Sequence, residues 1–142
     1  MKKKSCHLYY PVNWFSLILM LTNLKNRDFH NVLYLNVNRF DNETINFFRN
    51  YLLVQFDELK IINHKRKRLY SGKTQLENFI TRTAEIKKFK NRLKTDFNHY
   101  NVKKIYFGGD DFNFAVYRSI NKIVTTIFVE HGWGNIIHAI SS

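Results

Sequence analysis

The stretch IFVEHGWGN, residues 127–135, decides the fold, because an apolar run typical of a buried strand passes directly into a charged turn with two glycines. A second stretch, KKIYFGGDDF at residues 103–112, has the same design. In an open α/β sheet, the loops that follow the carboxyl ends of the strands form the ligand crevice. Four of the chain's five glycines lie in these two turns, so we expect the chemistry of the protein there.

Outward from these turns, apolar runs and helical periodicities alternate along the chain. Strands are predicted at residues 5–10, 31–37, 59–62, 103–107 and 124–129, and helices at 14–24, 42–54, 74–98 and 110–120. Apolar residues on several faces of the helix at 14–24 predict that it is largely buried, and either Asp41 or Asn42 can cap the helix at 42–54. The helix at 74–98 has an apolar stripe predicted to face the core: Leu76, Phe79, Thr83, Ile86, Leu93 and Phe97. Parallel strands need a helix-length connection between them. The sequence therefore predicts one α/β domain over residues 1–142, with a Rossmann-like parallel sheet of about five strands and helices on both faces.

Charge is concentrated in the middle of the chain. The formal net charge is +12, and residues 60–104 hold 14 Lys or Arg against three acids. Such a field attracts polyanions such as nucleic acid, acidic lipid, acidic polysaccharide or sugar nucleotides, and a solvated helix face is the alternative explanation.

Two features of the sequence bear on location. A lone cysteine, Cys6, excludes an internal disulfide and suits a reducing compartment. The lysines at residues 2–4 and the apolar run at 17–21 imitate a signal peptide, but no small-residue cleavage site follows and the run is too short to span a bilayer. We expect a cytoplasmic protein, either free or peripheral at the inner face of the membrane.

Ser71-Gly72-Lys73-Thr74 imitates the end of a phosphate-binding P-loop. The P-loop pattern requires a glycine five residues before Gly72, where this chain has Lys67. A capping box explains these residues better: Thr74 would cap the following helix while Glu77 reaches back to its amide.

The two glycine turns hold the candidate site residues. Asp110 and Asp111 follow a strand, and because helix capping needs only one carboxylate, the other can bind a ligand hydroxyl or face water. A carboxylate at a strand end, such as Glu130, can be partly desolvated, which raises its pKa and suits a general base. His131 could orient that base, share a proton or bind phosphate, and Gly132 would let a substrate approach the backbone. The structural alternative is a turn with an ion-paired glutamate.

Other chemistries have less support. The six histidines show no paired zinc spacing, although His131 and His138 with Glu130 could be imagined as ligands. No G-x-S-x-G elbow indicates a hydrolase, and no G-x-G-x-x-G follows a strand. We therefore expect neither a metal nor a cofactor.

Four segments carry a family resemblance: CHLYYPVNWF (6–15), NVLYLNVNRF (31–40), KKIYFGGDDFNFAVYRSI (103–120) and TTIFVEHGWGN (125–135). Through them the whole chain resembles the N-terminal half of bacterial sialyltransferase- and polysialyltransferase-like glycosyltransferases, of the family 52 and capsule polysialyltransferase types. Those enzymes have two facing Rossmann-like domains, the GT-B architecture. The resemblance implies synthesis of a surface polysaccharide or lipooligosaccharide.

The resemblance also implies roles for individual residues. The family has an acidic–acidic–glycine motif after a late strand, and one acid is the general base toward the acceptor hydroxyl. Glu130 and Gly132 match its first and third positions, while His131 replaces the second acid. Glu130 and His131 would thus be catalytic, and Asn13, Asp110, Asp111 and Gly132 would bind substrate.

The same resemblance implies inverting transfer of sialic acid from its cytidine monophosphate donor to a glycan acceptor. The family binds that donor through a His-Pro motif in the second domain, and this sequence contains no His-Pro. We therefore expect the chain to be the acceptor-side half, inactive alone unless a partner chain supplies the donor domain. The alternative is a non-enzymatic basic module that binds nucleic acid or an anionic membrane surface.

Overall fold

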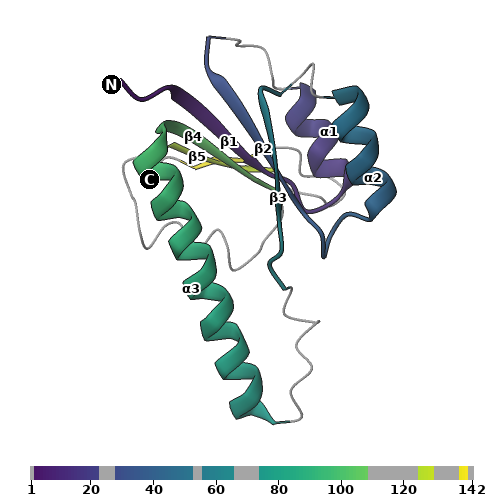
Figure 1. Cartoon of the computed structure of the whole chain (residues 1–142), viewed down its shortest axis with the longest axis vertical. Helices are drawn as coiled ribbons and strands as arrows, with labels where there is room; N and C mark the ends of the chain where they lie inside the picture. Colours follow the sequence, from purple (N-terminus) through teal and green to yellow (C-terminus); the bar gives the residue numbers. More distant parts are fainter. Residues whose placement is uncertain are drawn as a thin grey trace.

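A six-stranded sheet organises the chain (Figure 1). The computed structural model describes residues 2–22, 28–52, 56–65, 74–108, 125–129 and 138–140, the last two ranges by their backbone alone. In spatial order the strands are β3 (Glu58–Ile62), β2 (His30–Asn36), β1 (Ser5–Tyr10), β4 (Asn101–Gly108), β5 (Thr125–Val129) and β6 (His138–Ile140). Each neighbouring pair from β3 to β5 is parallel, and β6 is antiparallel to β5. The predicted parallel α/β fold is confirmed, and β6 is a strand that the sequence pattern did not reveal.

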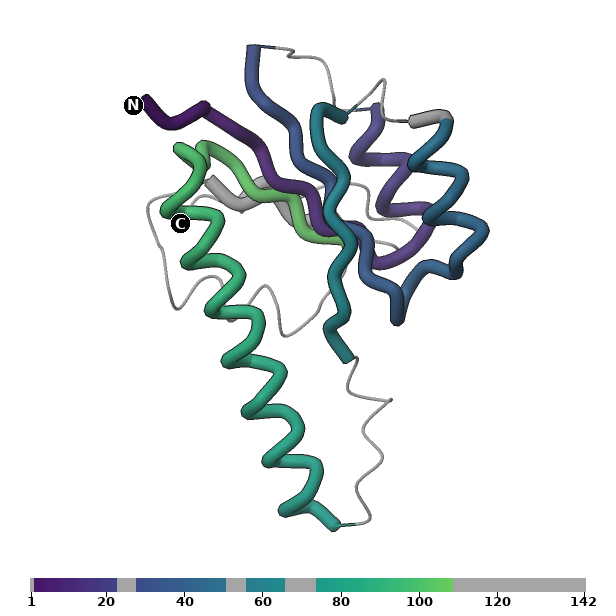
Figure 2. The backbone as a smooth tube through the Cα atoms, viewed as in Figure 1, coloured from purple at the N-terminus to yellow at the C-terminus, as the bar shows by residue number. Residues whose placement is uncertain are grey.

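Helices cover both faces of this sheet (Figures 1 and 2). The helices α1 (Trp14–Thr22) and α2 (Asn42–Phe47) lie on one face, with a π-helical turn, η1 (Phe48–Leu52), continuing α2. The long helix α3 (Gln75–His99) lies on the other face. The predicted helix at 110–120 lies outside the described residues.

Alternate residues of each strand face opposite helices, as a pleated strand requires. On β1, Leu8 and Tyr10 pack with Phe89 and Leu93 of α3, whereas Tyr9 belongs to the cluster on the α1 and α2 side. The second cluster contains Tyr9, Leu17, Met20, Leu33, Leu35, Phe40, Ile45, Phe48, Phe56 and Tyr106. Both faces of the sheet are thus buried, which explains why its strands read as continuous apolar runs.

A buried polar group joins α3 to its face of the sheet. The Asp96 side chain is 2% exposed, and its carboxylate lies 3.5 Å from Nζ of Lys60 and accepts a 3.4 Å hydrogen bond from the Tyr10 hydroxyl. The Lys60 ammonium also lies over the rings of Tyr34 and Tyr100. Removing one partner of a buried ion pair leaves the other charge buried and unpaired, which is costly. The Lys60–Asp96 contact therefore fixes the position of α3 along β3.

Side-chain caps start two helices where the sequence predicted them. The Asp41 carboxylate accepts a 2.8 Å hydrogen bond from the Thr44 amide at the start of α2. The Thr74 hydroxyl accepts a 3.1 Å bond from the Glu77 amide at the start of α3. The Ser71–Thr74 motif therefore ends in a helix cap, as expected for a structural role.

Two expectations about burial are wrong. The first helix was expected to be largely buried, but Trp14, Phe15 and Ile18 are about half exposed because α1 packs on the sheet through Leu17 and Met20. The apolar stripe of α3 was expected to be core along its length. Its first members, Leu76 and Phe79, are exposed because the helix extends past the sheet before it reaches the core at Phe89.

Candidate functional site

The strand order places a topological switch point between β1 and β4. From β1 the chain adds strands outward in one direction, to β2 and β3, and then crosses to the other side of β1 with β4 and β5. Such a reversal opens a crevice beyond the carboxyl ends of the two central strands. The candidate site is therefore bounded by the turns that follow Tyr10 and Gly108.

The turn after β1 is closed by a compact set of hydrogen bonds between Asn13 and Ser16. The Asn13 side-chain oxygen accepts a 2.8 Å bond from the Ser16 amide. The Ser16 hydroxyl in turn accepts bonds from the amides of Val12 and Asn13, at 3.0 and 3.1 Å, and donates to the Asn13 carbonyl. Asn13 thus belongs to the turn after β1, and its side-chain oxygen caps α1. The Val12 and Asn13 amides, being occupied, are not offered to a phosphate.

Gly108 lets the end of β4 approach this turn. A Cβ on Gly108 would lie 2.6 Å from both Cβ and Oγ of Ser16 and 3.1 Å from the Val12 amide nitrogen. Carbon atoms do not approach so closely, so any side chain here would push β4 and the start of α1 apart. The close contact explains why a glycine is needed at position 108, the first of the two glycines in this turn.

The register of β4 and β5 places the ends of these two strands next to each other at the carboxyl edge, the end of the sheet where its parallel strands finish. Gly108 pairs with Val129 across parallel strands, and Tyr10 pairs with Phe107. Glu130 follows Val129 directly, and Asp110 and Asp111 follow Gly108 by two and three residues. Asp110, Asp111, Glu130, His131 and Gly132 themselves lie outside the described residues. The strand ends that lead into them are adjacent.

Uncharged amides fasten the same edge further along, between β2 and β3. The Asn36 side chain accepts a 3.2 Å bond from the amide of His64 and donates a 2.8 Å bond to its carbonyl. Asn38 donates a 2.7 Å bond to the side-chain oxygen of Asn63. These asparagines belong to no recognisable sequence motif, so the hydrogen bonds between the ends of β2 and β3 were not predicted from the sequence.

A buried histidine, His64, lies two residues after the end of β3 at this edge. Its side chain is 1% exposed, and neither ring nitrogen has a hydrogen-bond partner within the described ranges. Burial, followed by the charges of Lys88 and Arg92, lowers the pKa of His64 to about 4. Although Nδ1 lies 3.7 Å from a Glu85 oxygen, the ring is neutral at pH 7 and the contact is no ion pair there. That oxygen accepts the Lys65 amide instead.

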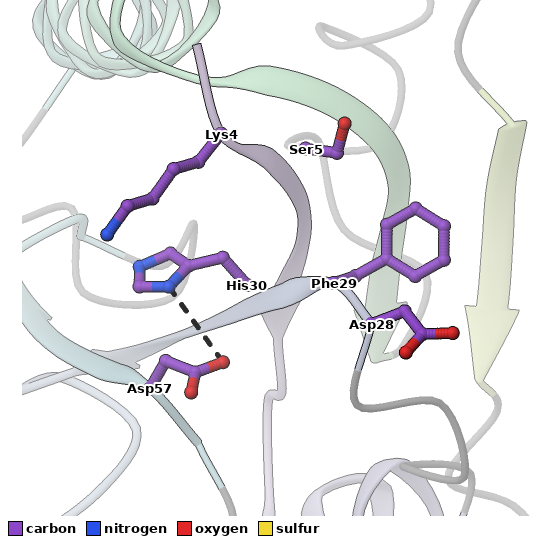
Figure 3. Close-up of a pocket in the computed structure, with 6 residues that line it drawn as sticks. All are labelled: Lys4, Ser5, Asp28, Phe29, His30 and Asp57. Carbon is purple, nitrogen blue, oxygen red and sulfur yellow. Dashed lines mark ion pairs between the residues drawn. The ribbon is translucent and has the colours of Figure 1, made fainter. Parts of the chain in front are cut away.

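A cavity of about 310 Å³ lies at the opposite, amino-terminal edge (Figure 3). Its lining residues are Lys4, Ser5, Asp28, Phe29, His30 and Asp57. The His30 ring points toward Asp57, with Nδ1 at 3.9 Å from the carboxylate, and that carboxylate accepts a 2.7 Å bond from the Asn31 amide. Because α/β sheets bind ligands beyond their carboxyl ends, we assign this open cavity no catalytic role.

Beside the cavity, Glu58 links three elements. Its carboxylate lies 2.7 Å from Nε2 of His30 on β2 and accepts a 2.7 Å bond from the hydroxyl of Tyr100 after α3. Burial raises the pKa of Glu58, but the hydrogen bonds to Tyr100 and His30 outweigh it, so the net pKa is lowered. These partners satisfy the carboxylate, which makes the cluster a structural tie between β2, β3 and α3.

No metal centre is formed by the described residues, in which no group of three or more His, Cys, Asp or Glu side chains could hold an ion. None of the helices in the described part has the length and hydropathy that a membrane span requires. No family model, curated protein or solved structure matches this chain. Function is therefore inferred from the residues and their placement alone.

Proposed function

We propose that this chain is the acceptor-side, Rossmann-like domain of a sialyltransferase-like glycosyltransferase, one half of a GT-B architecture. The reaction would transfer sialic acid from its cytidine monophosphate donor to a glycan acceptor of a surface polysaccharide or lipooligosaccharide. The proposal places the donor pocket outside these 142 residues, on a second domain or a partner chain. The observation that carries it is the pairing of Gly108 with Val129.

That pairing supports the proposal because it makes the two strand ends that precede the glycine turns adjacent. Glu130 directly follows Val129 in the sequence, and Asp110 and Asp111 follow Gly108 by two and three residues. Asn13 belongs to the neighbouring turn, since β1 pairs with β4. The candidate base and the candidate acceptor-binding residues therefore belong to three adjacent strand ends.

In the proposed step, the acceptor hydroxyl attacks the anomeric carbon of sialic acid. Glu130 removes the hydroxyl proton as the new carbon–oxygen bond forms. The bond between the sugar and the phosphate oxygen breaks, cytidine monophosphate leaves, and the configuration inverts. A general base contributes most when it is within hydrogen-bond reach of the proton it removes. His131 would orient Glu130 or bind substrate.

The test measures acceptor binding and turnover separately. We expect this chain to bind an oligosaccharide acceptor without turning over labelled cytidine monophosphate–sialic acid. Glu130→Gln and Asn13→Ala should weaken acceptor binding, while Lys4→Ala in the opposite cavity, as the matched control, should not. Turnover by the chain alone would refute the half-enzyme proposal, and the absence of any acceptor binding would refute the acceptor assignment.

A second candidate function, nucleic-acid binding, is favoured by exposed basic side chains on α3 and β4, among them Arg82, Lys87, Lys94, Lys103 and Lys104. Phosphate contacts release counterions, so such binding would weaken steeply with salt. A salt titration with DNA or RNA beside an acidic glycan separates the two functions. A preference for the glycan would contradict the nucleic-acid function.

A further inference from the structure

The first turns of α3 form the far tip of the molecule. Figures 1 and 2 show that this end of the helix extends beyond the ends of the described strands, whereas its last turns lie beside the sheet. Three large apolar side chains at the tip are mostly exposed: Leu76 (68%), Phe79 (65%) and Ile80 (59%). Exposed apolar groups gathered at one place mark an interaction surface.

A straight stripe continues from this tip along the helix. Leu76, Ile80, Thr83, Lys87, Lys90 and Lys94 follow one another at steps of four, three, four, three and four residues. At 3.6 residues per turn these side chains lie on one face of the helix. The stripe is apolar at the tip and basic toward the sheet.

No acid interrupts the stripe. The three carboxylates of α3 belong to Glu77, Glu85 and Asp96, and none occupies a stripe position. Glu85 and Asp96 are buried on the side that packs against the sheet. The charged residues of the stripe are therefore all positive, and its other end is apolar.

We propose that this stripe, which runs along one face of α3 from Leu76 to Lys94 and has Phe79 beside it, docks on an anionic phospholipid membrane. The tip enters the headgroup region, where Leu76, Phe79 and Ile80 leave water, and the three lysines contact lipid phosphates. Interfacial helices combine an apolar face with Lys or Arg in this way, and each lysine near an anionic leaflet contributes about fivefold in affinity. Nucleic acid would satisfy the lysines but offers no apolar layer to the tip.

The experiment is co-sedimentation with vesicles of phosphatidylcholine alone or mixed equally with phosphatidylglycerol. We expect binding to the anionic vesicles only, weakened by salt. The Lys87→Gln, Lys90→Gln, Lys94→Gln triple variant should lose about a hundredfold in affinity, as expected for three lysines. The Lys2→Gln, Lys103→Gln, Lys104→Gln triple, which has the same net charge, should bind nearly as the parent chain does. Equal losses in both triples would overturn the assigned face.

A second variant tests the apolar tip. The triple variant Leu76→Gln, Phe79→Gln, Ile80→Gln introduces glutamine, a good helix former, at three exposed positions. The circular dichroism spectrum should therefore be unchanged. We expect at least a roughly tenfold loss of vesicle binding, because three apolar side chains no longer leave water. The control Phe15→Gln, Ile18→Gln on α1 should bind as the parent. The proposal is overturned if the tip variant binds vesicles normally, if RNA is bound more tightly than vesicles, or if the stripe is occupied by a second copy in a stable dimer.

Discussion

The two edges of the sheet are held together by different chemistry. At the amino-terminal edge the contacts are ionisable: Glu58 joins His30 and Tyr100, and His30 approaches Asp57. At the carboxyl edge the contacts of the strand ends are mostly uncharged, made by Asn13, Asn36 and the Ser16 hydroxyl and by the close approach of Gly108, while the Glu85 carboxylate accepts the Lys65 amide beside His64.

This difference in contacts suggests different roles: the amino-terminal edge stabilises the fold, and the carboxyl edge holds the candidate site. At the amino-terminal edge Glu58, His30 and Tyr100 satisfy one another, so these groups serve the packing of the strands. The amides of the carboxyl edge fix the starts of the turns that lead to Asp110, Asp111 and Glu130, without adding described charges between them. A site that must bind a glycan acceptor and position one base gains from such fixed, neutral surroundings.

The largest effect should come from filling the close approach at the carboxyl edge. Gly108→Ala would place a carbon 2.6 Å from Ser16, and overpacking of this kind costs about 2 kcal/mol of unfolding free energy. Urea denaturation measures the change. Ser16→Gly removes the opposing atoms, so the double variant should be more stable than the sum of the single changes predicts. A Gly108→Ala protein as stable as the parent would contradict the described contact.

An effect of about the same size, but present only in acid, concerns the buried histidine at the carboxyl edge. His64 has a pKa of about 4 in the fold and about 6.5 when unfolded, so the unfolded chain binds a proton first as the pH falls. Stability is therefore complete above about pH 6.5 and is lost toward pH 4, by roughly 2 kcal/mol at about pH 5. His64→Phe should flatten this part of the pH dependence. His7, whose pKa burial also lowers to about 4, should contribute in the same direction and remain in that variant.

Urea unfolding of parent and variant at pH 7 and at about pH 5 measures this difference. An unchanged slope with pH in His64→Phe would mean that the histidine is already charged or solvated in the fold.

The smallest effect is expected at the amino-terminal edge. Glu58→Gln weakens the bonds to Tyr100 and His30, but the Glu58 side chain is 36% exposed, so we expect a loss of about 0.5–1 kcal/mol at pH 7. Because the folded pKa of Glu58 is lowered, the carboxylate contributes above the unfolded pKa and its contribution fades as the pH falls through the folded value. Parent and variant should therefore converge in acid. A loss larger than that of Gly108→Ala would reverse the ranking of the two edges.

Local patterns predicted much of the fold. Apolar runs located the strands, and the cap residues Asp41 and Thr74 located two helix starts. The antiparallel β6 was missed because three residues carry too little periodicity. The exposure of Leu76 and Phe79 was missed because helical spacing shows which residues share a face but not whether another element covers it.

The contacts between strands could not be predicted, since they depend on strand order. His30, Glu58 and Tyr100 are 28 and 42 residues apart in sequence and meet only because β2 pairs with β3 and α3 returns beside them. The hydrogen bonds between Asn36 and His64 arise from the same pairing. That Asn13 binds substrate stays a prediction from the resemblance, while the pairing of β1 with β4 makes its turn follow a strand end adjacent to that of β4.

The most direct test of the central claim, that the site lies at the carboxyl edge, is an NMR titration of the isotope-labelled chain with an oligosaccharide acceptor. We predict that amide shifts will concentrate at Asn13, at Gly108 and at residues 129–132, and that Lys4, His30 and Asp57 will stay unchanged. Shifts confined to Lys4, His30 and Asp57, or no shifts at a saturating acceptor concentration, would contradict it.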